Sequence, residues 1–280
     1  MKSLKAIRIF LLVSCFVVLS SFAAAQTTTL LKRTTTKTDK FDFGSGGTLA
    51  LIGAPNGSVT IEGWAKNEIE ILAEITIEAP AEADLDRISK LTGFTLEEST
   101  GRTGVISYGI HDKKFLKRND KKFPKALLTT PFRIDYTIKV PRYCDLQIDG
   151  GTGDLTISGV EGTMRLNYLD TNAKLHLVGG AVTAVFGKGS ADISIPTRSW
   201  GGRFVDVQLA AGTMNLSLPT GLNADFDASI LRTGTIENTF TGFKPRVRNV
   251  QFTDKLIAAK AGTGGVSLKF AVGDGTMKIK

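Results

Sequence analysis

The segment Gly153-Asp154-Leu155-Thr156-Ile157-Ser158 decides the fold, because variants of it return throughout the second half of the chain. Each variant alternates apolar and polar residues, so that one face of a strand turns inward, and its glycines permit positive-φ corners. Recurrence at about 20 residues is typical of stacked rungs that bury their apolar faces against one another. The sequence therefore predicts an all-β fold with a β-solenoid-like stack of short strands. The later copies lie at residues 173–177, 191–196, 212–219, 265–270 and 275–279.

A second β region, with longer strands, precedes the repeats. Residues 57–64 and 68–77 alternate cleanly, and we expect the strands of this region to pair in an antiparallel manner. One short helix is predicted over residues 81–91, with Pro80 at its start and Gly93 just past its end. The predicted organisation is a signal peptide (1–25), a flexible leader (26–40), an N-terminal β region (41–141) and a repeat region (142–280) that continues the same core.

The first 25 residues have the features of an export signal. Three basic residues precede an apolar run at 9–22, and Ala23-Ala24-Ala25 offers a cleavage site, which predicts an exported protein, either periplasmic, on the outer surface or extracellular. An alternative is lipid attachment at Cys15, because Leu12-Val13-Ser14-Cys15 fits a lipobox. An uncleaved anchor is a further alternative. The Thr- and Lys-rich leader that follows is expected to be flexible and could add an edge strand to the sheet.

Charge and cysteine content limit the partners. The 280-residue chain has 35 basic and 27 acidic residues, and losing the three basic residues of the signal leaves a net charge of +5. This permits contact with anionic surfaces without requiring it. Cys144 would be the sole cysteine after cleavage at Ala25, so no internal disulfide is expected, and its apolar neighbours predict a buried core residue. Export and the absence of a binding module argue against nucleic acid, and no transmembrane span is expected after cleavage.

A basic insertion at residues 111–125 is the best candidate for recognition. Its cations alternate with Phe115, Leu116 and Phe123, and they could contact anionic lipid headgroups or acidic polysaccharide. The alternative, which we favour, is a solvated hairpin whose aromatic residues pack back on the sheet. The candidate contacts are Lys113, Lys114, Lys117, Arg118, Lys121 and Lys122.

A second candidate interrupts the repeats at Arg198, Trp200 and Arg203. A tryptophan between two arginines could stack on a sugar ring, or it could equally cap the core.

Other motifs favour structure over chemistry. The glycine-rich segments at 150–153 and 187–190 precede strands rather than helices, so they are turns and not phosphate-binding loops. Four aspartates near turns could converge to bind calcium or cleave sugars, but aspartate also favours turns, and we favour that interpretation. His111 and His176 lack the spacing of a metal site. No catalytic residue, metal or cofactor is therefore predicted. The four aspartates are Asp149, Asp154, Asp170 and Asp192.

The order of these parts resembles a family of secreted bacterial β-strand-repeat proteins labelled putative adhesins, whose domain has no established function. The resemblance rests on the strand pair at 57–64 and 69–71, the helix at 81–91, the strand at 135–141 and the repeat at 151–162. It implies a β-solenoid-like fold outside the cytoplasm and transfers no catalytic residue. The basic insertion and the ragged segment 197–204 depart from the family pattern.

The sequence favours a secreted, non-catalytic protein of the cell envelope or surface, which binds other molecules through its strand faces and loops. Its partner would be an anionic glycan, a lipid surface or another envelope protein. One alternative is a carbohydrate-active enzyme built on a β-helix. The other is a periplasmic scaffold that contacts anionic lipid or polysaccharide.

Overall fold

The computed structural model describes residues 30–248 and 250–280. Contacts divide the chain into a unit Met1–Leu30 and a compact unit Leu31–Lys280, and the second unit contains every strand described below. The predicted signal peptide, its Cys15 and residues 26–29 of the leader lie outside the described residues.

All strands of this unit belong to one 17-stranded sheet, which confirms the predicted all-β class. The first seven are β1 (Leu31–Asp42), β2 (Thr48–Asn56), β3 (Val59–Trp64), β4 (Glu68–Ala79), β5 (Gly93–Ser99), β6 (Arg102–Tyr108) and β7 (Phe132–Pro141). The others are β8 (Asp145–Thr152), β9 (Leu155–Ser158), β10 (Glu161–His176), β11 (Gly179–Ser194), β12 (Gly201–Ser217), β13 (Ala224–Ile230), β14 (Gly234–Asn238), β15 (Phe243–Pro245), β16 (Leu256–Ala261) and β17 (Ser267–Ile279).

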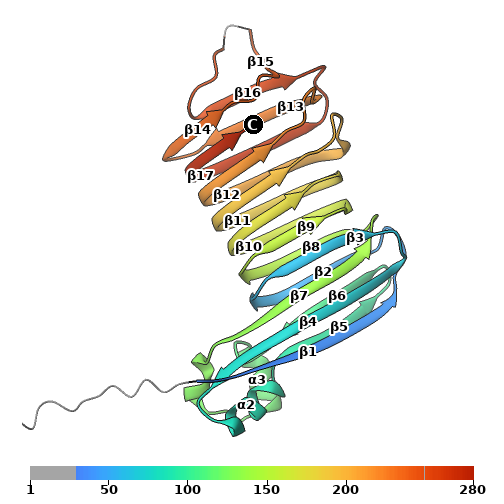
Figure 1. Cartoon of the computed structure of the whole chain (residues 1–280), viewed down its shortest axis with the longest axis vertical. Coiled ribbons are helices and arrows are strands. Elements are labelled where there is room, and N and C mark those ends of the chain that lie inside the picture. Colours follow the sequence, from blue (N-terminus) through green and yellow to red (C-terminus); the bar gives the residue numbers. More distant parts are fainter. Residues whose placement is uncertain (1–29, 249) are drawn as a thin grey trace, which may run out of the picture. The chain divides into compact units, whose positions relative to one another are not determined.

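The repeats form a parallel ladder in which β10, β11, β12 and β17 pair in that order (Figure 1). Alternation places every second side chain inside, so that Leu175, Ile193, Leu216 and Ile279 align in one buried column. The strands are longer than the predicted short rungs. Most of the repeat segment 173–177 forms the end of β10, and most of the segment 191–196 forms the end of β11. Each of these strands has 16 residues.

A glycine column sets how closely these strands approach. Gly189, Gly212 and Gly275 lie in register, with φ values of 115°, 140° and 142°. A Cβ atom on Gly212 would lie 1.9 Å from the carbonyl oxygen of Gly189, and one on Gly275 would lie 1.8 Å from that of Gly212. Only glycine satisfies both the positive φ and the close backbone contact, which explains its recurrence in the repeats.

The N-terminal region is antiparallel only in part. The pairs β1–β4, β4–β7 and β5–β6 are antiparallel, as predicted, but β2 is parallel to β6 and β8, and β3 is parallel to β7 and β9. Because β8 and β9 also pair with β10, the parallel ladder begins inside this region. A single cluster of buried apolar residues runs from Phe43 to Ile279.

The described part of the leader adds an edge strand, which its sequence allowed for. This strand, β1, pairs with β4 from Leu31 opposite Ala79 to Asp42 opposite Glu68.

The predicted single helix is joined by a second helix within the basic insertion. The first, α2 (Glu82–Ser89), lies within the predicted range 81–91. The insertion is not a hairpin, because it contains α3 (Lys113–Asn119) and leads into a 3₁₀ helix, η2 (Lys125–Thr129), that begins at its last residue. The Asp112 side chain caps α3 by accepting hydrogen bonds from the backbone of Lys114 and Phe115.

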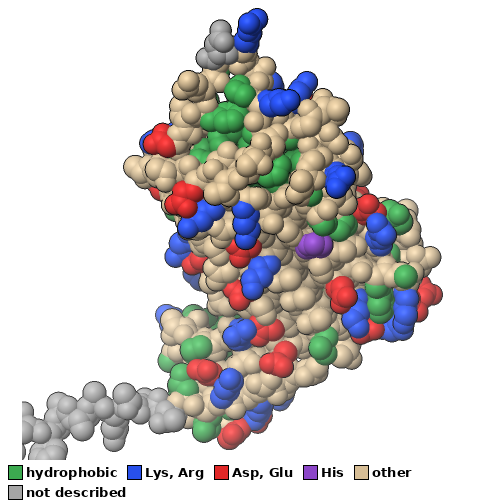
Figure 2. Space-filling model, turned by 45° about the horizontal axis from the view of Figure 1, so that its top comes forward, with side chains coloured by type: hydrophobic (Ala, Val, Ile, Leu, Met, Phe, Trp, Pro, Cys, Tyr) green, Lys and Arg blue, Asp and Glu red, His purple; other side chains and the backbone are tan. Residues whose placement is uncertain are grey.

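Aromatic side chains cover the far end of the ladder. There β16 pairs antiparallel with β13 and β15, and Phe226 stacks on Phe243 with ring centroids 4.5 Å apart. Figure 2 shows hydrophobic side chains gathered at this end. Among the residues that the structure describes, no helix combines the length and apolar character that a membrane crossing requires.

Candidate ligand-binding surfaces

The second halves of the ladder strands present a polar face to solvent. Alternation places the apolar residues of these segments inside, so the intervening polar side chains form columns across neighbouring strands. We call this surface the polar face. Its members on or beside β9, β10, β11, β12 and β17 are Asp154, Thr156, Ser158, Asn172, Lys174, His176, Ser190, Asp192, Ser194, Thr213, Asn215, Ser217, Thr276, Lys278 and Lys280, all exposed or half-buried.

Hydrogen bonds along the columns order the polar face. The Asn172 side chain donates to Asp154 at 3.1 Å and accepts from the Ser190 hydroxyl at 2.9 Å. In the next column the Asn215 amide donates to the Asp192 carboxylate at 2.6 Å. Strands about 4.8 Å apart bring such side chains within reach of one another. The face is therefore a regular array of hydrogen-bonding groups.

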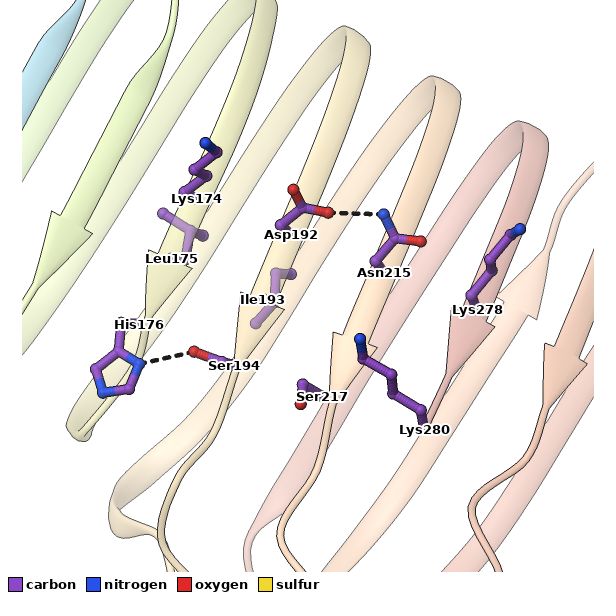
Figure 3. A pocket seen from close by; sticks show the side chains of 10 residues that line it. All are labelled: Lys174, Leu175, His176, Asp192, Ile193, Ser194, Asn215, Ser217, Lys278 and Lys280. Carbon is purple, nitrogen blue, oxygen red and sulfur yellow. Dashed lines mark hydrogen bonds between the residues drawn. The ribbon is translucent and has the colours of Figure 1, made fainter.

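The polar face is hollowed into an open groove with a volume of about 480 Å³ (Figure 3). Lys174 and His176 of β10 line one side, and the other is lined by Lys278 of β17 and by Lys280, which directly follows β17. Asp192, Asn215 and the serine hydroxyls of β11 and β12 lie between them. The lining thus contains three lysines and one aspartate, and that aspartate is already bonded to Asn215.

The three lysines of the groove differ in whether they form an ion pair. Lys278 lies 3.4 Å from Glu237 in an exposed ion pair. Within the described part of the chain, neither Lys174 nor Lys280 has an ion-pair partner. The groove therefore offers two ammonium groups without an ion-pair partner among the described residues, one from Lys174 on β10 and one from Lys280, whose side chain reaches back toward Ser217 (Figure 3).

A histidine and a serine meet in the groove without the carboxylate partner of a Ser-His-Asp triad in the part of the chain that the structure describes. His176 Nδ1 lies 2.8 Å from the Ser194 hydroxyl. Among the described residues, no carboxylate bonds to His176 Nε2, so the pair lacks the third group that orients a catalytic histidine. Both side chains also lie on an open face from which water is not excluded.

The six predicted cations of the basic insertion are all exposed, and none forms an ion pair among residues 30–248 and 250–280. The aromatic residues of the insertion pack back on the fold, as the favoured alternative predicted. Phe115 stacks on Tyr108 at 4.8 Å, and the Arg87 guanidinium lies 5.5 Å from the Phe123 ring centroid. The insertion is thus a fixed helix on the sheet with its charges turned outward.

The tryptophan of the second candidate is buried. Trp200 is only 7% exposed, and its indole nitrogen donates to the carbonyl of Gly180 at 2.9 Å. Its ring belongs to the core cluster, so of the two interpretations that the sequence left open, packing on the core fits this geometry better than stacking on a sugar. Arg203 makes a 3.4 Å contact with Thr163, and Arg198 is exposed at the preceding loop.

The four predicted aspartates do not converge. Asp154 bonds to Asn172, Asp170 forms an ion pair with Lys188, and Asp192 bonds to Asn215. Asp149 pairs with Asn167 of β10 in yet another column. In the described ranges, no group of three His, Cys, Asp or Glu residues could hold a metal ion.

Two further residues are structural. Cys144 is buried, as predicted, and burial raises the pKa of its thiol to about 12. The His111 ring stacks on Phe132 at 5.4 Å, and partial burial lowers its pKa.

Sequence reasoning missed the lysines of the groove. One pattern recurs at the same position of two repeats, where a basic or titratable residue stands on each side of an inward apolar residue. The two segments with this pattern are Lys174-Leu175-His176 and Lys278-Ile279-Lys280. This recurrence was the signal that could have found them.

Solved structures similar to the chain include the three that follow, while no protein-family model and no curated protein matches it. The first is a putative cell adhesion protein from Clostridium sporogenes, with 13% identity, coverage of 89% of this chain and 99% of that one, and a TM-score of 0.44. The second is a putative adhesin from Bacteroides fragilis, with 11% identity, coverage of 88% and 97%, and a TM-score of 0.32. The third is a putative lipid binding protein from Parabacteroides distasonis, with 9% identity, coverage of 88% and 97%, and a TM-score of 0.25. Two of these names belong to the class of protein that the repeats resemble, but likeness at this level assigns no function to the chain.

Proposed function

We propose that this chain is an exported, non-catalytic binding protein of the adhesin type, which holds an extended acidic polysaccharide in the groove of its polar face. The observation that carries the proposal is the placement of the ammonium groups of Lys174 and Lys280 in a groove with a hydroxyl-lined floor. The proposal places the protein in the cell envelope or on the cell surface, in agreement with the export signal expected from the sequence.

The shape of the groove suits a chain rather than a compact molecule. It crosses four adjacent strands, so the backbones of β10 and β17 are about 14 Å apart, three strand spacings of about 4.8 Å. It is open along its length, as a binding site for a polymer has to be. A ligand with regularly spaced carboxylates could contact Lys174 and Lys280 together while its hydroxyls bond to the serine and asparagine side chains between them.

The arrangement of carboxylates supports binding without cleavage. Glycosidases need two carboxyl groups within about 5–10 Å on either side of one bond. In the groove the single aspartate, Asp192, is held by Asn215. The alternative of a carbohydrate-active enzyme therefore finds no support in this surface.

Binding of soluble polysaccharides to the chain from Gln26 onward tests the proposal. We expect saturable binding to polygalacturonate, weakened by salt, and no binding to neutral dextran. The double variant Lys174→Glu/Lys280→Glu reverses the two groove lysines that have no ion-pair partner within the described ranges. It should weaken binding about tenfold or more, because it removes two exposed charge pairs with the ligand. The matched control is Lys114→Glu/Lys117→Glu, which carries the same net charge and leaves the groove intact.

Two results would contradict the proposal. Equal loss of binding in both variants would mean that net charge alone matters and that the groove is not the site. Release of reducing sugar from polygalacturonate would make the protein an enzyme.

A further inference from the structure

Helix α3 and the turn after it carry their cations on one side. At 100° per residue, Lys113, Lys114, Lys117 and Arg118 lie within an arc of about 140°. Phe115 and Leu116 occupy the opposite side, where Leu116 is buried. Lys121 and Lys122 follow directly and are also exposed. We call these six residues the α3 surface.

The carboxylates beside the α3 surface are already engaged by the fold. Asp112 accepts hydrogen bonds from two backbone amides of α3 at 2.9 and 3.0 Å. Asp120 accepts two hydrogen bonds from the Arg87 guanidinium, at 2.6 and 2.9 Å, and this pairing lowers its pKa. The positive charge of the α3 surface therefore faces solvent without internal compensation.

Exposed leucines accompany the charge at the same end of the sheet. Leu31 begins β1 and pairs with Ala79 at the end of β4, while the amide of Glu78 donates to the carbonyl of Pro131. These contacts bring the start of β1 next to the segment that follows η2, and Figure 1 shows α2 and α3 at this end. Leu31 is 40% exposed and Leu128 of η2 is 39% exposed. Cations beside exposed apolar side chains are typical of surfaces that lie on a bilayer.

The chain enters the folded unit at this end. The first described residue of the folded unit's edge strand, Leu31, lies at the same end as α2 and α3. The exposed leucines at this end favour a bilayer over a soluble polyanion as the partner of the α3 surface, because a polyanion would use only the positive charge.

We propose that the α3 surface docks on a bilayer of anionic phospholipids and fixes this end of the molecule at the membrane. The polar face belongs to the ladder strands, so it takes no part in this contact and remains available to a polysaccharide. The α3 surface and the groove are independent sites for two different partners.

Vesicle co-sedimentation tests the α3 surface with the chain from Gln26 onward, which contains every described strand and lacks the apolar segment that would insert into any bilayer. We expect binding to vesicles of phosphatidylcholine mixed with phosphatidylglycerol, none to pure phosphatidylcholine, and release at high salt. Lys114→Glu/Lys117→Glu should weaken binding about 30-fold or more, since each cation near an anionic surface contributes about fivefold. The groove variant Lys174→Glu/Lys280→Glu has the same net charge and should bind vesicles like the unaltered chain.

Hydrogen exchange separates direct contact from a change in folding. We expect vesicles to slow exchange of the amides of residues 113–122 in the unaltered chain, and circular dichroism of both variants to remain that of a folded β protein. Equal vesicle binding by the α3 variant would overturn the proposal. So would a loss of polygalacturonate binding in that variant with vesicle binding retained, which would make the α3 surface a polysaccharide site.

Discussion

Single glycines fix the geometry of the ladder, because their hydrogen atoms face a backbone carbonyl of the next strand. Gly212 combines a φ of 140° with a site where an added Cβ would lie 1.9 Å from the Gly189 carbonyl oxygen. The neighbouring atom is backbone and cannot rotate away. Conformation and contact thus act together at one residue.

We expect Gly212→Ala to lower the free energy of unfolding by about 3 kcal/mol or more, from backbone strain plus overpacking. Urea unfolding followed by circular dichroism measures the change. Gly265→Ala is the matched control, because Gly265 has a φ of 132° but no atom within 4 Å of the added Cβ. Gly265→Ala should lower the free energy of unfolding only by the cost of backbone strain. A decrease as large as that of Gly212→Ala would refute the role of the close contact.

At the scale of elements, α3 and the turn after it are held to α2 by an ion pair and a cation–π contact, and to the sheet by an aromatic contact. Arg87 of α2 binds Asp120 at the end of α3, and the same guanidinium lies over Phe123. Phe115 packs on Tyr108 of β6. The helix that carries the α3 surface therefore depends on a carboxylate that titrates in acid.

The pKa of Asp120 is lowered below its ordinary value of 3.8, first by its hydrogen bond with Arg87. A carboxyl with a lowered folded-state pKa stabilises the fold at pH values above 3.8, and this contribution is lost as the pH falls through the lowered value. Asp120→Asn should therefore speed hydrogen exchange in α3 at pH 6, while the variant and the unaltered chain should converge once the pH falls below the lowered pKa of Asp120. A difference that persists unchanged in acid would show that the ion pair does not hold the helix.

At the scale of the whole unit, the antiparallel region and the parallel ladder share one core. The cluster of buried apolar residues is continuous, and β8 and β9 pair with strands of both parts. The two tryptophans report on different places, Trp64 at the end of β3 and Trp200 beside the start of β12.

We expect residues 31–280 to unfold in a single cooperative transition. In Trp64→Phe the fluorescence of Trp200 reports on the ladder, and in Trp200→Phe that of Trp64 reports on the N-terminal region. In each variant the urea midpoint by fluorescence should equal its midpoint by far-ultraviolet circular dichroism. Separate midpoints would show that the two regions are independent folding units.

The sequence by itself determined which side chains are buried and where the chain turns. Alternation has a period of two residues, so Leu175 and Ile193 face inward whatever strand lies beside them. A corner with a positive φ is likewise a local property of the backbone, and this requirement explains the glycines of the repeats. These local rules gave the all-β class, the buried Cys144 and helix α2.

Only the tertiary structure decided which strands are neighbours. Every strand alternates in the same way, so the pattern cannot distinguish parallel from antiparallel partners, and the N-terminal pairing was only partly predicted. The groove exists because the register of the ladder brings Lys174 and Lys280 to opposite sides of one surface although they lie far apart in the chain. Trp200 could be assigned to the core only once Gly180 was known to lie beside it. Burial follows from local sequence, whereas a binding surface depends on contacts between distant segments.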